Sequence, residues 1–319
     1  MRSEIEHAVA ILREGGLVAF PTETVYGLGA DARSEAAVAR IFAAKGRPAG
    51  HPLIVHLPRA EHLDRWARAA PEVARALASR FWPGPLTIIL EKQPDVPDAV
   101  TGGQPTVGLR VPSHPLALAL LDAFDGGLAA PSANRFGSVS PTSAAHVVSE
   151  LGGRVDLVLD GGPCEVGVES TIVDLSVPSE PRLLRPGGIA REALESVLGP
   201  VVVGGGEVRA PGTLASHYAP HAEVRAVDAG LLASEAARAA GEGRRAVVLA
   251  ARDVEGLPRI ALPDEPAARA RRLYAALREV DAAGYEVAIV ALSPEDGLGA
   301  ALSDRLRRAS APRSGPEGT

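Results

Sequence analysis

The sequence predicts an α/β protein, with a first domain built on a twisted mixed β-sheet with helices and a small C-terminal domain built on an open, Rossmann-like α/β sheet. Three observations support this class. Short apolar strand patterns and amphipathic helical patterns occur along the whole chain. In the first part several strands follow each other directly, so strand and helix do not strictly alternate. A Gly- and Pro-rich stretch at 201–212 then interrupts regular structure.

The first part opens with a helical pattern that runs to about Glu14, followed by an apolar strand at 17–20. The segment 21–29 is too rich in Gly and Thr for a helix. A helix is predicted over 34–45, with Gly46 as its C-terminal stop. Further strands are predicted at 53–57, 86–91, 106–111, 128–130, 155–159, 171–175 and 182–184, and further helices at 61–69, 71–81, 115–124, 143–151 and 190–198.

The second part, after the break, alternates more regularly. This pattern predicts a small open α/β sheet. Its strands are predicted at 223–227, 245–250, 259–262 and 286–292, and its helices at 231–240, 265–283 and 299–309. The length of 319 residues agrees with two domains of the usual ~100–200 residues each.

Composition excludes several classes of protein. Hydrophobic residues make up 46% and charged residues 23%, which excludes a disordered chain. No apolar run approaches the ~18 residues of a membrane helix, and acids near the N-terminus replace the basic head of a signal peptide. The single cysteine, Cys164, excludes an internal disulfide framework and a multi-cysteine metal site. We therefore expect a cytoplasmic enzyme or binding protein without a membrane partner.

Common catalytic and nucleotide motifs are absent. The chain has no G-x-x-x-x-G-K-[ST], H-E-x-x-H or G-x-S-x-G, and Gly27 and Gly29 do not continue into G-x-G-x-x-G because residue 32 is Ala. A tight turn explains these two glycines as well as a role in binding a ligand does. Cys164 has no obvious base beside it in the sequence, so it is a poor candidate nucleophile. The net charge of −6 provides no general attraction for nucleic acid.

Two segments carry residue types that are rare in this chain. Lys45 is one of only two lysines, and with Arg47 it could converge on one polyphosphate, although cations at a helix C-terminus are also routine. Asn134 is the only asparagine and lies in a loop after a predicted strand, where α/β sheets bind ligands. Hydroxyl residues follow it in the same loop, and N-capping accounts for Thr142 or Ser143.

A third set consists of single polar residues at predicted strand ends: Thr22, Thr24, His56, Arg110, Ser170 and Arg185. Arg110 stands where another apolar residue is expected, and a buried guanidinium needs a carboxylate or phosphate partner. His56 is explained equally well as a hydrogen-bonded edge histidine. Together these residues predict a site for an anion-rich ligand held by Arg, Lys and hydroxyl groups, with no covalent nucleophile required.

Several motifs, in this order along the chain, closely resemble those of the YrdC superfamily. They are T-E-T-V-Y-G-L-G at 22–29, K-G-R-P at 45–48, P-L-I-V-H at 52–56, W-P-G-P-L-T at 82–87, V-G-L-R-V-P at 107–112, P-S-A-N at 131–134, E-S-T-I-V-D at 169–174 and L-R-P-G-G at 184–188. The resemblance covers about residues 3–205, and residues 211–220 are similar to the linker of the long, two-domain form. It implies a YrdC-like catalytic domain at 1–205, a linker over the active site at 206–222 and an accessory domain at 223–319.

The resemblance implies a nucleotidyltransferase reaction in which L-threonine, bicarbonate or CO₂, and ATP give threonylcarbamoyl-AMP and pyrophosphate. Mg²⁺ is expected to bridge phosphate oxygens with few protein ligands of its own. The product would pass to proteins that modify the adenosine beside the anticodon of certain tRNAs. Whether the chain itself binds tRNA is left open.

The resemblance also assigns residues, position by position. Thr24, His56, Arg110, Ser170 and the main chain near Ala130 are expected to hold threonine. Lys45 and Arg47 are the expected catalytic cations. The expected ATP site consists of Lys45, Arg47, His51, Thr106, Ser132, Asn134, Ser140, Arg185 and Tyr218. Tyr218 belongs to the linker, where His217 is the alternative to it. His51 stands where the family often has a different polar residue.

Two other functions are compatible with parts of this pattern. One is adenylation of a different carbamoyl-like acid, as in hydrogenase maturation proteins, but this chain lacks their additional cysteines and length. The other is a non-catalytic RNA-binding module. The acidic balance of the chain and the expected threonine site argue against that second alternative.

Overall fold

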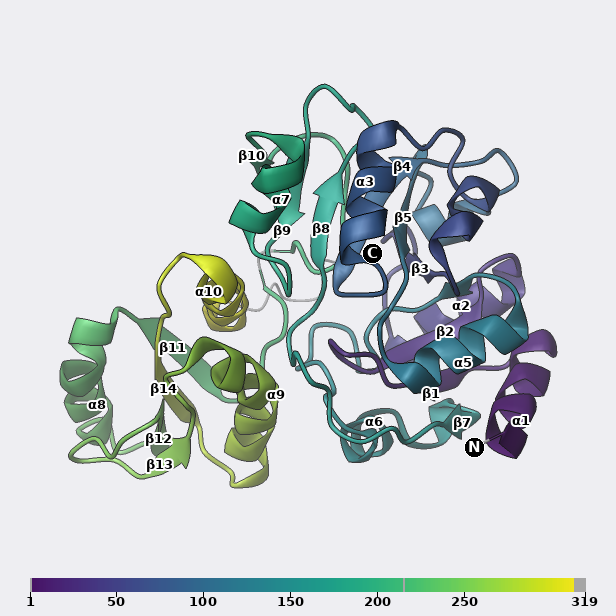
Figure 1. The fold of residues 1–319 in the computed structure, drawn as a ribbon. Coiled ribbons are helices and arrows are strands. Elements are labelled where there is room, and N and C mark those ends of the chain that lie inside the picture. The colour runs from purple at the N-terminus through teal and green to yellow at the C-terminus, as the bar shows by residue number, and fades with distance from the viewer. Residues whose placement is uncertain (1, 215, 313–319) are drawn as a thin grey trace. The chain divides into compact units, whose positions relative to one another are not determined.

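The computed structural model describes residues 2–214 and 216–312 and divides the chain into two compact units (Figure 1). The first unit comprises Met1–Phe136 and Pro141–Thr213, and the second comprises Gly137–Ser140 and Leu214–Thr319. The segment 206–222 is thus divided between them. The three-part division expected from the sequence, with boundaries at 205 and 222, stays a prediction, and its last residues, 313–319, lie outside the described part of the chain.

The first unit is built on a ten-stranded mixed sheet, in the order β10-β9-β8-β4-β5-β3-β6-β2-β1-β7. Its strands are β1 (Val18–Phe20), β2 (Gly27–Asp31), β3 (Ile54–His56), β4 (Leu86–Glu91), β5 (Thr106–Arg110), β6 (Leu128–Ala129), β7 (Leu157–Val158), β8 (Thr171–Asp174), β9 (Arg182–Arg185) and β10 (Val202–Val203). Its helices are α1 (Arg2–Arg13), α2 (Glu35–Lys45), η1 (Ala60–Arg65), α3 (Glu72–Phe81), α4 (Asp98–Thr101), α5 (Pro115–Phe124), α6 (Ala144–Leu151), η2 (Gly152–Arg154) and α7 (Arg191–Leu198), of which η1 and η2 are 3₁₀ helices.

This architecture confirms the predicted mixed α/β fold, with local differences. Gly46 ends α2 in the left-handed conformation at φ 60°, as its place after the helical pattern predicts. The helix expected at 61–69 is wrong in type and length, because the chain there forms only the 3₁₀ helix η1. The segments 21–29 and 201–212 contain residues of β2 and β10, which pair with the preceding strands β1 and β9 although their Gly-rich sequences carry little strand signal.

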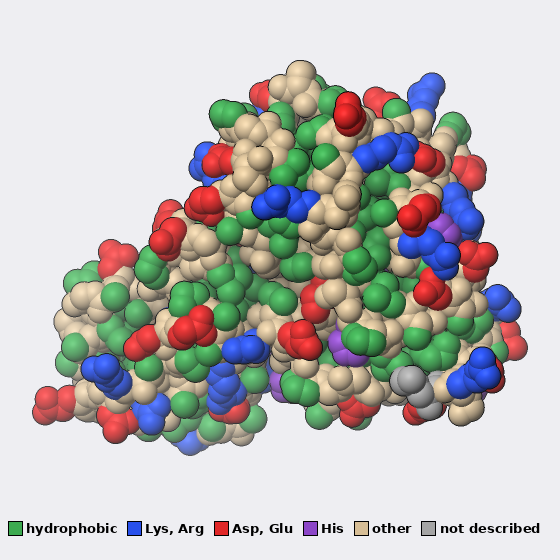
Figure 2. All heavy atoms as spheres, in the orientation of Figure 1, with side chains coloured by type: hydrophobic (Ala, Val, Ile, Leu, Met, Phe, Trp, Pro, Cys, Tyr) green, Lys and Arg blue, Asp and Glu red, His purple; other side chains and the backbone are tan. Residues whose placement is uncertain are grey.

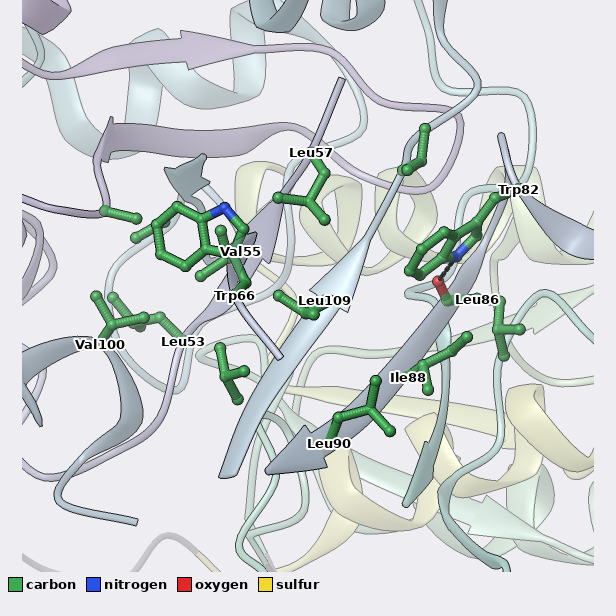
Figure 3. Packing of buried hydrophobic residues seen from close by; sticks show 14 of the residues in the cluster. Leu53, Val55, Leu57, Trp66, Trp82, Leu86, Ile88, Leu90, Val100 and Leu109 are labelled. Carbon is green, nitrogen blue, oxygen red and sulfur yellow. Dashed lines mark hydrogen bonds between the residues drawn. The ribbon is translucent and has the colours of Figure 1, made fainter. Parts of the chain in front are cut away.

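The two faces of this sheet differ in character because side chains alternate along each strand. Val55, Ile88 and Leu109 point into the main hydrophobic core, which also contains both tryptophans of the chain, Trp66 and Trp82 (Figure 3). The indole N–H of Trp82 donates to the carbonyl oxygen of Leu86 at 2.7 Å, so this buried polar group is satisfied. The residues between these apolar positions therefore belong to the opposite face of the sheet.

The second unit contains a four-stranded parallel sheet in the order β11-β14-β12-β13, as expected for a small open α/β sheet. Its elements are β11 (Glu223–Val227), η3 (Ala229–Leu231), α8 (Leu232–Ala240), β12 (Ala246–Ala250), β13 (Arg259–Ala261), α9 (Pro266–Ala282), β14 (Val287–Ala291) and α10 (Gly297–Ser310). Helices α8 and α9 lie on opposite sides of the sheet (Figure 1). Small residues of α8, Ala236 and Ala239, pack against Val248 and Ile289.

Two further observations concern the helices and the charged surface. Among the described residues, no helix is long and apolar enough to cross a membrane. Figure 2 shows basic and acidic side chains scattered over the visible face of the molecule, without a large area of either sign. This mixture agrees with the modest net charge of −6.

Candidate active site

The candidate site lies on the face of the ten-stranded sheet opposite the main core. We call this the polar face and define it by His56, Thr87, Thr106, Arg110 and Ser170. Gly108 lies between Thr106 and Arg110 in β5. A Cβ added to it would meet the side chains of Thr87, Ile54 and Ile89, so Thr87 of β4 lies on the same face as Thr106 and Arg110. Each polar-face residue is at most 5% exposed. Strand alternation thus brings together residues that are far apart in the sequence.

Arg110 is the central cation of the polar face. Its Nη2 atom lies 2.6 Å from Oε1 of Glu23, and both side chains are at most 5% exposed. Its Nε atom donates to the carbonyl oxygen of Gly84 at 3.3 Å. The carboxylate partner required for a buried Arg110 is therefore Glu23 of the protein itself. Within the described residues Nη1 has no hydrogen-bond partner, so this nitrogen is the donor that remains for a ligand.

His56 and Thr24 lie close to this ion pair in the fold. His56 is paired in register with Arg110 across β3 and β5. Burial lowers the pKa of His56 to about 3, with the Arg110 charge adding to the effect, so the ring is neutral at pH 7. Its Nδ1 atom is buried without a partner among the described residues. The hydroxyl of Thr24 lies 2.8 Å from that of Thr22, which also donates to the carbonyl oxygen of Val25 at 2.7 Å.

Lys45 connects α2 to the loop that contains Asn134. The ammonium donates to the carbonyl oxygens of Ser132 and Asn134 at 2.5 and 2.6 Å. Burial lowers the pKa of Lys45 well below its usual range, and the Arg47 charge lowers it further. An anionic ligand would reverse this by favouring the charged form. The loop itself is fixed to the sheet, since the Ala130 amide donates to the carbonyl oxygen of Ile54 at 2.9 Å.

Arg47 and His51 flank one aromatic ring. The guanidinium carbon of Arg47 is 5.7 Å from the centre of the Phe136 ring, and the His51 ring centre is 5.5 Å from it. Arg47 also donates to the carbonyl oxygen of Pro52 at 3.0 Å. Burial lowers the pKa of His51, and the charges of Arg47 and Arg209 lower it further, so His51 is a neutral ring beside two guanidinium groups.

Arg185 is hydrogen-bonded to Ser170. Arg185 donates through Nε and Nη2 to the carbonyl oxygen of Ser170 at 3.1 and 2.9 Å, and through Nη2 to its hydroxyl at 3.1 Å. The hydroxyl of Thr87 lies 2.8 Å from that of Ser170. Nη1 of Arg185 donates to the carbonyl oxygen of Pro211 at 2.8 Å.

A small cavity adjoins this group on the polar face. It is lined by Thr87, Thr106, Gly108, Pro211 and their neighbours. Gln104 ties the chain over it, because the Arg209 amide donates to Gln104 Oε1 at 2.6 Å and Gln104 Nε2 donates to the Arg209 carbonyl oxygen at 3.0 Å. The segment that contains Arg209 and Pro211 therefore forms one wall of this cavity.

The other two residues expected at the nucleotide, Ser140 and Tyr218, belong to the second unit. There the segment Gly137–Ser140 is bonded to the linker, because the Ala219 amide donates to the Gly137 carbonyl oxygen at 3.0 Å. Tyr218 has a positive φ of 61° and stacks on Tyr274, with ring centres 5.8 Å apart. Their expected role at the nucleotide stays a prediction.

Sequence reasoning did not single out Glu23 or Thr87. A signal existed for both. Glu23 is an acid between two hydroxyl residues that precede an apolar pair, and Thr87 is the one polar residue before the terminal Glu91 of the strand predicted at 86–91. Cys164 is a buried cysteine. Burial raises the pKa of its thiol to about 12, so it stays protonated at pH 7.

The fold and the site together define a class of protein: a mixed α/β sheet whose polar face holds buried cations and hydroxyl groups suited to anionic, non-covalently bound ligands. The family model for Sua5, YciO and YrdC proteins, described as "Telomere recombination", matches residues 10–187. A second model, described as "Threonylcarbamoyl-AMP synthase, C-terminal domain", matches residues 189–311. The chain belongs to the Sua5/YrdC family, in its long two-domain form.

Relatives match the chain over nearly its whole length. The threonylcarbamoyl-AMP synthase of Pyrococcus abyssi is 44% identical over 320 residues, which cover 96% of this chain and 94% of the relative. The threonylcarbamoyl-AMP synthase of Bacillus subtilis is 42% identical over 328 residues, covering 97% and 94%. A solved structure of P. abyssi Sua5 complexed with L-threonine is 43% identical, with a TM-score of 0.91 over 97% of this chain and 95% of that one.

Proposed function

We propose that this protein condenses L-threonine, bicarbonate or CO₂, and ATP into threonylcarbamoyl-AMP and pyrophosphate. The observation that carries the proposal is the polar face, where a buried Arg110 keeps one free donor beside neutral His56, on the same face as the hydroxyl of Ser170. The family supports the same reaction, since relatives bear the name threonylcarbamoyl-AMP synthase and one was solved with L-threonine.

In this proposal Arg110 binds the α-carboxylate of threonine through Nη1. Because Glu23 and Gly84 hold the other side of the guanidinium, the free donor has a defined direction. Neutral His56 and the hydroxyls of Thr24 and Ser170 supply partners for the hydroxyl and carboxylate oxygens of threonine. The main chain near Ala130 completes this expected subsite.

Lys45 and Arg47 are the proposed catalytic cations, acting on the phosphates of ATP. The carbamate formed from the threonine amine and CO₂ attacks the α-phosphorus through an oxygen, and the bond from that phosphorus to the β-phosphate oxygen breaks to release pyrophosphate. Charge therefore moves onto the leaving pyrophosphate, where cations stabilise it. Residues that line the remaining proposed nucleotide site in the first unit are His51, Thr106, Ser132, Asn134 and Arg185.

Magnesium enters this proposal as part of the substrate, the MgATP complex. The described residues contain no group of three or more His, Cys, Asp or Glu side chains that could hold a metal ion. In this proposal the ion is held mainly by phosphate oxygens and water, which is how Mg²⁺ commonly binds beside nucleotides. The activated product would then be consumed by separate proteins that transfer the threonylcarbamoyl group to tRNA.

The test measures pyrophosphate release from ATP by the full-length protein. We expect release only when L-threonine and bicarbonate are both present, and equal release with L-serine or without an amino acid would refute the substrate assignment. Arg110→Ala should raise the KM for threonine at least about tenfold, the loss expected for one charged contact of ~1.5–3 kcal/mol. Lys45→Ala and Arg47→Ala should instead reduce turnover.

The matched control for these variants is Arg191→Ala, which removes a half-exposed guanidinium of α7 that pairs with Glu195 on the surface. Its turnover should equal that of the unaltered protein. If all three site variants also retain full turnover, the proposed residue assignment is wrong even where the reaction is correct.

A further inference from the structure

The hydroxyl of Thr87 occupies a junction that the proposed reaction does not yet use. Thr87 is fully buried in β4, and its Oγ1 lies 2.8 Å from Oγ of Ser170, which is 1% exposed. Arg185 donates to the same Ser170 oxygen at 3.1 Å. The three side chains thus form a hydrogen-bonded row, Thr87–Ser170–Arg185, in the interior of the first unit.

The two hydroxyl groups of this row have one hydrogen more than the contact between them uses. The two hydroxyls carry two hydrogens, and the contact between them uses one. Among the described residues neither hydroxyl has another acceptor. Either hydroxyl can be the donor in their contact; when Thr87 donates, it fills the remaining acceptor position of Ser170 Oγ, which already accepts from Arg185, and the Ser170 hydrogen is left to be donated elsewhere. A buried hydroxyl hydrogen without an acceptor is unfavourable, so an acceptor supplied by a ligand would satisfy it.

The position of the row links two groups of site residues. Thr87 lines the small cavity together with Thr106 and Pro211. The Pro211 carbonyl oxygen accepts from Arg185, so the same arginine contacts both the cavity wall and Ser170. Under the proposed function, Thr106 and Arg185 serve the nucleotide and Ser170 serves the amino acid.

We propose that Thr87 is a positioning residue that couples amino-acid binding to nucleotide binding through Ser170 and Arg185; this inference rests on the proposed function. An amino-acid oxygen that accepts the Ser170 hydrogen fixes Thr87 as the donor within the row. Ser170 then keeps both acceptor positions filled, which holds the Arg185 guanidinium in one orientation toward the nucleotide. Coupling of this kind is reciprocal, so the nucleotide must strengthen amino-acid binding by the same factor.

The test compares L-threonine binding by calorimetry with and without a non-hydrolysable ATP analogue. In the unaltered full-length protein the analogue should tighten threonine binding at least about fivefold, the lower end of typical coupling between sites. Thr87→Val keeps the shape but removes the hydroxyl, and it should reduce this factor to less than about twofold. Thr87→Ser restores a hydroxyl and should restore the coupling.

The matched control is Thr101→Val, which removes a hydroxyl that is equally buried and lies outside the row, near the Asp98 carbonyl oxygen at 3.5 Å. It should couple like the unaltered protein. Full coupling in Thr87→Val, or none in the unaltered protein, would overturn the inference. Tryptophan fluorescence checks whether each variant is folded. If Thr87→Val does not fold, a folded Thr87→Ser variant that shows no coupling would also overturn the inference. Failure of the unaltered protein to release pyrophosphate would instead refute the proposed function.

Discussion

Removing one partner of the buried ion pair between Glu23 and Arg110 should destabilise the first unit far more than removing one partner of a surface pair. Its atoms are 2.6 Å apart and both side chains are at most 5% exposed. Removing one partner of such a pair typically costs about 3–5 kcal/mol, because the other charge stays buried without compensation. Glu23→Gln has the size of the native residue, but its amide oxygen can accept from only one of the two donors that the carboxylate serves, Arg110 and the amide of Ser113.

We therefore expect Glu23→Gln to lower the free energy of unfolding of the first unit by about 3 kcal/mol. Both tryptophans of the chain, Trp66 and Trp82, lie in the core of this unit, so tryptophan fluorescence during urea titration reports on it alone. In a double-mutant cycle, Glu23→Gln with Arg110→Gln should cost about 1–3 kcal/mol less than the sum of the single variants. The surface control Glu195→Gln should cost less than about 1 kcal/mol.

A cost below about 1 kcal/mol for Glu23→Gln would refute the reasoning, since it equals the value of an exposed pair. Additive effects in the cycle would refute it independently. That result would mean that Arg110 is held by its contact with the Gly84 carbonyl oxygen rather than by the carboxylate. The threonine subsite would then need a different explanation for the direction of its cation.

Two further changes test other parts of the structure. Burial lowers the pKa of His56 to about 3, below the ~6.5 of the unfolded chain, so unfolding takes up a proton and stability should fall by up to ~1.4 kcal/mol per pH unit from pH 6.5 toward pH 3. His56→Gln should flatten this fall in acid urea titrations, and an unchanged slope would contradict the assignment. Gly102 and Gly103 both have positive φ, but only at Gly102 would a Cβ approach the Gly50 carbonyl oxygen, to 2.2 Å. Gly103→Ala should cost about 1–2 kcal/mol and Gly102→Ala clearly more, whereas equal costs would show that the clash is relieved.

Most secondary structure could be predicted because its signals are local. Strand β4 at 86–91 and helix α5 at 115–124 match their predicted bounds, since apolar periodicity and turn residues mark both ends. The differences have separate causes. Strands β2 and β10 lie in Gly-rich segments and are held in the sheet by pairing with β1 and β9, and the sequence at 61–69 has helical periodicity but forms one short 3₁₀ segment.

The candidate site could be predicted as an inventory of residues but not as an arrangement. Rare residue types and misplaced polar residues pointed to Lys45, Asn134 and Arg110 before any geometry was known. The same reasoning required a carboxylate or phosphate partner for Arg110, and the structure supplies the carboxylate of Glu23, which is 87 residues away in the chain. No local pattern encodes which of many acids folds back onto a given arginine.

The sequence alone determined the two-part α/β organisation, the set of cations and hydroxyls, and the motifs typical of the family, because propensity, periodicity and motif order are properties of neighbouring residues. Only the tertiary structure decided that Thr87, Arg110 and Ser170 share one face of a sheet, and that Gly137–Ser140 belongs with the second unit. These features depend on strand order and register between segments that are distant in sequence. Such pairing is selected by the packing of the whole sheet rather than by any single segment.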